Sequence, residues 1–234
     1  MIDFSKIVSL KGEFEAEGLS RDSVAAEAAF AARNHLPYLV KIGGCEAKSD
    51  VRFLMMQGIR SVVAPMIESA FAMRKYMEMI PDGAFDHVGV TIETVDAVER
   101  IEALLDAGEK LNEVTVGRTD LTASYDGTDV NSDETVAMVK TVARAAAKRG
   151  LPTTMGGSIN ANTLALLQRD GELRELIAAV ETRKCVMKVE SFLLDGALED
   201  AFAVERALLD MQLAHHGALT RAAGDRIEKL GARL

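Results

Sequence analysis

The chain has 234 residues, 48% of them hydrophobic, and a formal net charge of −9. This length and composition suit one domain that buries a single large core. The negative charge argues against nucleic acid or an anionic membrane surface as a partner, and no apolar run is long enough to span a bilayer. The two cysteines, Cys45 and Cys185, show neither metal spacing nor a disulfide framework, so we predict a cytoplasmic protein.

Strand-like runs alternate with helical patterns from residue 9 to about residue 189. This alternation predicts a parallel sheet, and no Gly-rich dinucleotide fingerprint follows the first strand, which favours a closed TIM-type (β/α)8 barrel over a doubly wound sheet. We count seven to eight strands, so the barrel is complete or short by one strand. The predicted strands are 10–17, 38–42, 61–67, 88–93, 114–120, 152–155, 177–180 and 185–189.

After Glu190 the pattern changes to an apolar stripe at helical spacing, with no strand after it. We therefore divide the chain into a barrel domain, residues 1–190, and a C-terminal helical extension, residues 191–234. The stripe must be covered by the bottom of the barrel or by a second subunit, and we favour the subunit and hence a homo-oligomer. The stripe consists of Leu194, Ala197, Leu198, Ala201, Val204, Leu208 and Met211.

Two strand-like runs each end in a carboxylate, Glu93 in one and Asp120 in the other. In the first run, alternate residues place Gly89, Thr91 and Glu93 on one face, where the small side chains leave space beside the carboxylate. A strand-end carboxylate with room for a ligand is what a divalent-metal site on a parallel barrel needs. The alternative is that the two carboxylates only belong to helix caps, because Thr94 and Asp120 both lie where a helix could start.

The first strand carries three glutamates, Glu13, Glu15 and Glu17, on one face. In a barrel that face is the interior, so Glu15 and Glu17 would point into the site and raise one another's pKa. Such a carboxylate suits a general base. An edge strand that faces solvent is the alternative explanation.

Two further features concern a loop and the core. Gly156-Gly157-Ser158 precedes a helix and either binds an anion through backbone N–H groups or forms a tight turn with Ser158 as the N-cap. A group of methionines is predicted to fill the core. The group consists of Met55, Met56, Met66, Met73, Met77 and Met79.

Three motifs resemble the HpcH/HpaI aldolase/citrate lyase family. They are Ala64-Pro65-Met66-Ile67-Glu68-Ser69, Val90-Thr91-Ile92-Glu93-Thr94 and Val116-Gly117-Arg118-Thr119-Asp120-Leu121-Thr122-Ala123-Ser124. The resemblance covers roughly residues 11–189 and implies a TIM barrel whose C-terminal helix is exchanged between subunits. It places the family's metal ligands on Glu93 and Asp120, with Mg²⁺ or Mn²⁺ chelating the keto and carboxylate oxygens of a pyruvate-like 2-oxo acid.

The chemistry of such a site follows from its ligands. Making or breaking a carbon–carbon bond next to a carbonyl passes through an enolate, and a divalent cation stabilises that charge as a Lewis acid. Two hard carboxylate ligands fit Mg²⁺ or Mn²⁺ and leave coordination positions for substrate and water. The leading interpretation is therefore a metal-dependent carbon–carbon lyase or aldolase.

The sequence departs from the family pattern at two places. Lys41 stands where many members have an arginine, and Arg118, beside Asp120, is predicted to share the recognition of the substrate carboxylate with it. Gly43 and Thr119 complete the predicted substrate contacts. No histidine lies where the aldolase branch has its catalytic one, so Glu17, Glu15 or a metal-bound water is the predicted base.

Three other functions stay open. A Schiff-base aldolase would use Lys41 or Lys188, because burial lowers the pKa of a lysine inside a barrel. A lyase of the citrate or malyl type would act on a CoA ester. A barrel retained only as a binding partner would explain the missing histidine, although the presence of both Glu93 and Asp120 argues against it.

Overall fold

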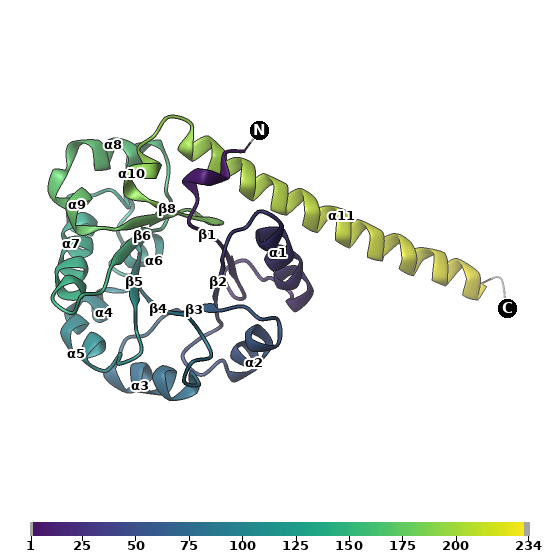
Figure 1. The fold of residues 1–234 in the computed structure, drawn as a ribbon, viewed down its shortest axis with the longest axis horizontal. Helices are drawn as coiled ribbons and strands as arrows, with labels where there is room; N and C mark the ends of the chain where they lie inside the picture. Colours follow the sequence, from purple (N-terminus) through teal and green to yellow (C-terminus); the bar gives the residue numbers. More distant parts are fainter. Residues whose placement is uncertain (1, 232–234) are drawn as a thin grey trace.

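The computed structural model of the protein describes residues 2–231. Eight strands close into a barrel in chain order, and helices surround it on the outside (Figure 1). The closed barrel confirms the predicted TIM-type fold and is not short of a strand. The strands are β1 (Ser9–Glu13), β2 (Tyr38–Lys41), β3 (Ser61–Ala64), β4 (His87–Ile92), β5 (Glu113–Gly117), β6 (Thr153–Gly156), β7 (Ala179–Glu181) and β8 (Cys185–Lys188).

Most helices follow a strand and return the chain to the start of the next one. Three of them begin at an N-cap residue with a polar side chain. The side chains of Ser20, Ser69 and Thr94 accept hydrogen bonds from the backbone of the first turn. The helices are η1 (Phe4–Lys6), α1 (Arg21–Arg33), α2 (Lys48–Met56), α3 (Ala70–Met79), α4 (Val95–Glu99), α5 (Ile101–Asp106), α6 (Arg118–Ala123), α7 (Asp133–Ala147), α8 (Ala161–Arg169), α9 (Gly171–Leu176), α10 (Val189–Phe192) and α11 (Ala197–Gly231). Within residues 2–231, none of these helices is apolar over a stretch that would cross a bilayer.

The last strand departs from the all-parallel sheet that the sequence predicts. β1 to β7 pair in parallel, but β8 runs antiparallel to both β7 and β1. Residues 182–184 form the hairpin between β7 and β8, in which the Thr182 N–H donates to the Cys185 carbonyl at 2.9 Å. Because β8 is reversed, Lys188 pairs with Ala179 at the end of the barrel where the parallel strands begin.

The first strand is shorter than predicted. β1 ends at Glu13, and the chain then turns, with the Gly18 N–H donating to the Glu15 carbonyl at 3.1 Å. Gly18 takes a φ of 61°, the left-handed conformation that glycine adopts at no steric cost. Glu15 and Glu17 therefore lie in a turn and do not continue the inner face of the strand.

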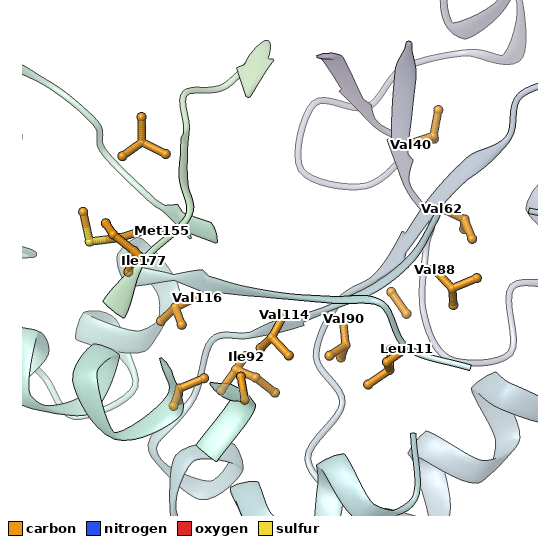
Figure 2. Packing of buried hydrophobic residues seen from close by; sticks show 14 of the residues in the cluster. Val40, Val62, Val88, Val90, Ile92, Leu111, Val114, Val116, Met155 and Ile177 are labelled. Atoms are coloured by element: carbon orange, nitrogen blue, oxygen red, sulfur yellow. The ribbon is translucent and has the colours of Figure 1, made fainter. Parts of the chain in front are cut away.

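The main hydrophobic core lies between the barrel and its helices. Alternate strand residues such as Val88, Val90, Val114 and Val116 point outward into this layer, as Figure 2 shows. This confirms the predicted outward face of β4. A small separate cluster fills part of the barrel interior, and it consists of Leu39, Val63, Ala179 and Val186.

The C-terminal helix α11 begins on the barrel and then extends away from it (Figure 1). Ala201, Val204 and Leu208 are fully buried within the single chain, so this part of the apolar stripe is covered by the protein's own barrel and not by a second subunit. Beyond them, Leu213 is 70% exposed and Leu219 is 55% exposed. The outer part of the helix thus presents apolar side chains to solvent.

The methionines are only partly in the core. Met73 and Met77 are buried as predicted. Met55, Met56 and Met66 are exposed, so the prediction of core packing is wrong for these three. The first two lie on the outer side of α2, and Met66 lies in the β3–α3 loop.

Candidate active site

A cavity of about 370 Å³ opens at the C-terminal ends of the parallel strands. This is the end of a TIM barrel at which active sites form. Glu93, directly after β4, and Asp120, in the first turn of α6, both line it. The two carboxylates that the sequence singled out therefore face one space.

Glu93 is held from two sides. Its Oε1 accepts a hydrogen bond from the Met66 N–H at 3.0 Å, and its Oε2 lies 3.1 Å from Lys41 Nζ. Gly117 makes room for it, because a Cβ there would lie 2.9 Å from Oε2. Burial raises the pKa of Glu93 and outweighs the opposing effects of Lys41 and the Met66 N–H, while Asp120 raises it further.

Lys41, at the end of β2, lines the same cavity and is mostly buried. Its ammonium group pairs with Glu93, one of the predicted metal ligands, and the substrate contact predicted for Lys41 stays a prediction. Thr119 also lines the cavity, and its Oγ1 lies 3.1 Å from Ser158 Oγ. Gly43 lies by a neighbouring cavity and donates its N–H to Asp50 Oδ2 at 3.0 Å.

A divalent cation suits the charge of this cavity. Asp120 is an exposed carboxylate on the cavity wall, and Glu93 supplies a second carboxylate nearby, which are the hard oxygen ligands that Mg²⁺ and Mn²⁺ prefer. Within residues 2–231 no cluster of three or more potential ligand side chains occurs, so these two would leave other positions to substrate and water. Five carboxylates line the cavity against three cationic groups: Glu13, Glu93, Asp120, Glu181 and Glu205 against Lys11, Lys41 and Arg183.

A second charged cluster, which we did not predict from the sequence, lies in the same cavity. Lys11 of β1 pairs with both Glu13 and Glu181, and all three side chains are buried. Burial lowers the pKa of Lys11, but Glu181 and Glu13 together outweigh it and the pKa is raised. Burial likewise would raise the pKa of Glu13, yet Lys11 and Lys41 hold it below the ordinary value. Lys11 is therefore a fixed cation.

Arg118 does not line the cavity, contrary to the prediction that it contacts the substrate. Its side chain is fully buried, and burial lowers its pKa to about 10. All three guanidinium nitrogens donate within the protein, to the carbonyls of Gly156, Gly157 and Val130 and to the side chains of Asn131 and Thr163. Arg118 therefore fixes the start of α6 against the loop after β6.

Glu17 lies outside the site. It lines neither this cavity nor the neighbouring one, and it pairs instead with Lys184 at the start of β8, which also pairs with Glu27 of α1 at 2.9 Å. Burial raises the pKa of Glu17 to about 7, a larger effect than the opposing attraction of Lys184. Repulsion from Glu27 and Glu13 adds less, so the shift arises mainly from burial and not from the neighbouring glutamates that we invoked. The catalytic role predicted for Glu17 thus has no geometric support.

Glu15 lies at the edge of the neighbouring cavity. It is exposed, and its Oε1 would lie 2.6 Å from a Cβ at Gly43, so the glycine makes room for it. The catalytic role predicted for Glu15 stays a prediction.

The loop after β6 forms another wall of the cavity. Gly157 and Ser158 line it in left-handed conformations, with φ of 83° and 50°. A Cβ at Gly157 would lie 2.5 Å from the Thr119 backbone nitrogen, so only glycine allows this close approach. Ser158 is not the N-cap, because α8 begins after Asn160, whose side chain accepts from Asn162 N and Thr163 N.

Helix α11 also contributes to the cavity. Phe202 and Glu205 line it, and Glu205 Oε1 lies 3.9 Å from Arg183 Nε in the β7–β8 hairpin. The segments that follow β1, β4, β5 and β6 supply further parts of the wall, together with that hairpin. The sequence gave no sign that the helical extension reaches the site.

These features define the class of protein: a closed α/β barrel with a carboxylate-lined cavity at the C-terminal ends of its strands. Solved structures to which it is similar include an HpcH/HpaI aldolase from Desulfitobacterium hafniense DCB-2, with 15% identity, 85% of this chain and 82% of that chain covered, and a TM-score of 0.60. The citrate synthase SbnG is similar at 13% identity, with 89% and 86% covered and a TM-score of 0.64.

An HpcH/HpaI aldolase/citrate lyase family protein from Burkholderia cenocepacia J2315 is also similar, at 17% identity, with 86% and 84% covered and a TM-score of 0.60. No family model and no curated protein matches the sequence. The solved structures thus confirm, at the level of the fold, the resemblance that the three motifs indicate. At these identities the reaction has to be argued from the site.

Proposed function

We propose that the protein is a divalent-metal-dependent carbon–carbon lyase or aldolase that acts on a 2-oxo acid or its aldol adduct through an enolate. The observation that supports this most directly is the placement of Glu93 and Asp120 on one cavity at the C-terminal ends of the strands. Glu93 and Asp120 would hold Mg²⁺ or Mn²⁺. The chemistry that the bound ion supplies is Lewis-acid stabilisation of the negative charge on the keto oxygen.

The chain's own side chains supply the remaining electrostatics. Lys41, next to Glu93, can donate a hydrogen bond to the keto or carboxylate oxygen of the substrate. Lys11 adds a fixed positive charge, oriented by Glu13 and Glu181. Because Arg118 is occupied by the protein itself, recognition of the substrate carboxylate falls to the cationic groups that line the cavity, Lys41, Lys11 and Arg183.

The lysine-based alternative is weaker. Lys188 lies at the opposite end of the barrel, on the reversed strand β8, and cannot reach the cavity. The raised pKa of Lys11 keeps it protonated and therefore not nucleophilic. Lys41 is the remaining candidate, and reduction with borohydride in the presence of pyruvate would trap a Schiff base if it formed one.

The experiment that tests the proposal is exchange of the methyl protons of pyruvate with solvent deuterium, followed by NMR, because exchange requires an enolate but no second substrate. We expect exchange that stops on chelation and returns with Mg²⁺ or Mn²⁺. Glu93→Gln and Asp120→Asn should each lose exchange and bound metal, the latter measured by elemental analysis.

Glu99→Gln, an exposed carboxylate on α4, is the matched control and should retain both exchange and metal. If Glu93→Gln and Asp120→Asn keep the metal content of the unmodified protein, the proposed metal site is wrong. If exchange persists in chelator and borohydride inactivates the enzyme, the Schiff-base alternative is correct.

We further propose that the protein is a homo-oligomer. The support is the outer part of α11, which exposes Leu209, Leu213 and Leu219 on a helix that extends away from the barrel (Figure 1). Packing of this segment on a neighbouring subunit stays a prediction, as does the cytoplasmic location.

A further inference from the structure

A second cavity adjoins the candidate active site. It has a volume of about 310 Å³ and shares five residues with the larger cavity: Glu13, Ala16, Lys41, Glu93 and Asp120. A molecule bound between Glu93 and Asp120 therefore borders both spaces. Carbon–carbon bond formation needs two substrates side by side, and two joined cavities offer one space for each.

The walls that belong to the smaller cavity alone are almost free of polar side chains. Only Glu15, at its edge, carries a charge, and the others are Ile42, Gly43, Gly44, Pro65 and Met66. The larger cavity differs, because Lys11, Arg183, Thr119 and Ser158 supply donors there. A carboxylate of the 2-oxo acid fits the larger cavity better.

The backbone of the smaller cavity offers few donors to a ligand. The Ile42 N–H donates to the Val63 carbonyl at 2.9 Å, and the Gly43 N–H donates to Asp50. The Met66 N–H donates to Glu93, and Pro65 has no N–H. An anionic group placed here would lose its hydration without gaining hydrogen bonds from these amides.

The charges around the smaller cavity also oppose an anion. Four carboxylates border it, against one ammonium group, that of Lys41. Even a divalent cation at Glu93 and Asp120 would leave an excess of negative charge. An uncharged, apolar group meets neither this repulsion nor a desolvation cost.

Met66 is an exposed apolar side chain on this wall. It is 52% exposed and takes a φ of 52°, which is uncommon for a residue other than glycine. That conformation belongs to the loop that directs the Met66 N–H to Glu93. The flexible thioether chain is suited to contact apolar ligands of different shapes.

We propose that the smaller cavity binds the second substrate and that this substrate is an uncharged aldehyde with an apolar chain. The inference rests on the proposed function. The enolate carbon of the 2-oxo acid forms a bond to the aldehyde carbon while the carbonyl π bond breaks. The aldehyde oxygen becomes an alkoxide and takes one proton, which gives a 4-hydroxy-2-oxo acid, and the proton lost from the methyl group balances it.

The test compares two aldehydes of similar size with pyruvate as the common partner: pentanal, which is apolar, and succinic semialdehyde, which is anionic. We expect kcat/KM to be at least about 10-fold higher for pentanal in the unmodified protein. Met66→Lys should shift the ratio by about 10-fold or more toward succinic semialdehyde. Met56→Lys, at a 77% exposed methionine on α2 outside both cavities, is the matched control and should leave the ratio unchanged.

The ratio of two aldehydes in one preparation does not depend on how much of a variant is folded. Equal or higher kcat/KM for succinic semialdehyde in the unmodified protein would overturn the proposal, and so would the same ratio in Met66→Lys and Met56→Lys. Deuterium exchange of pyruvate alone separates this failure from failure of the proposed function. Exchange without preference for pentanal refutes only the inference, whereas no exchange refutes both.

Discussion

The buried group around Lys184 predicts an unusual dependence of stability on pH. Glu17 pairs with Lys184, and its side chain is only 7% exposed. Its second oxygen, Oε1, has no hydrogen-bond partner among the described residues. Burial raises the pKa of Glu17 from 4.5 to about 7 in the folded protein, so the folded state binds a proton that the unfolded state has already released between these pH values.

The sign and size of the effect follow from this difference. Glu17 contributes stability that is fully present below about pH 4.5 and is lost as the pH rises through about 7. At about 1.36 kcal/mol for each pKa unit, the loss amounts to at most about 3 kcal/mol. Glu17→Gln cannot titrate, so relative to this variant the unmodified protein should lose up to about 3 kcal/mol of unfolding free energy between pH 4.5 and pH 8.

The measurement is urea denaturation at a series of pH values and one protein concentration. Circular dichroism is the suitable signal, because the chain contains no tryptophan. Glu15→Gln, an exposed carboxylate in the same turn, is the control and should keep the pH dependence of the unmodified protein. A difference between Glu17→Gln and the unmodified protein that stays constant with pH would refute the reasoning.

The same variant also tests the catalytic role that the sequence suggested. A general base would lose about 10²-fold or more in turnover on conversion to glutamine. Because Glu17 lines neither cavity, we expect turnover of Glu17→Gln within a few-fold of the unmodified protein. A large loss with unchanged metal content would restore Glu17 as a base.

Two other predictions concern Arg118 and the outer part of α11. Arg118→Lys should lower the unfolding free energy by at least about 3 kcal/mol in urea titrations, because most of the buried hydrogen bonds of the guanidinium are lost, whereas Arg100→Lys, on the surface, should not. Unchanged stability with a raised KM for the oxo acid would instead support substrate binding by Arg118. Leu209→Ser combined with Leu213→Ser should lower the mass measured by light scattering, and an unchanged mass would exclude the outer helix as the subunit contact.

Much of the site could be predicted because successive side chains of a β-strand point to opposite faces of the sheet. This alternation placed Glu93 on the inner face of β4 and Val88 and Val90 on the outer face, as the structure has them. The same rule would have placed Lys11 beside Glu13 on the inner face of β1, so that residue could have been found. Alternation does not reveal where a strand ends. The predicted strand therefore runs on through Glu15 and Glu17, although β1 stops at Glu13.

Arg118 shows a different limit of sequence reasoning. It lies two residues before Asp120, and both belong to the motif that resembles the family. In the first turn of α6 two positions correspond to about 200° of rotation. The Asp120 side chain therefore faces the cavity, whereas the Arg118 side chain is buried within the protein. The direction of β8, by contrast, could have been inferred, because only four residues separate the predicted strands 177–180 and 185–189, and a parallel pair needs a crossover of about a dozen residues or more.

The contribution of α11 to the cavity affects how such a site can evolve. In a barrel of eight repeated βα units, the loops that follow the strands supply the walls of the active site. Here part of the wall comes from Phe202 and Glu205 of α11, which lies outside the repeat. Substitutions in this helix can reshape one side of the cavity while every strand keeps its sequence, so substrate preference can diverge between related proteins at little cost to folding.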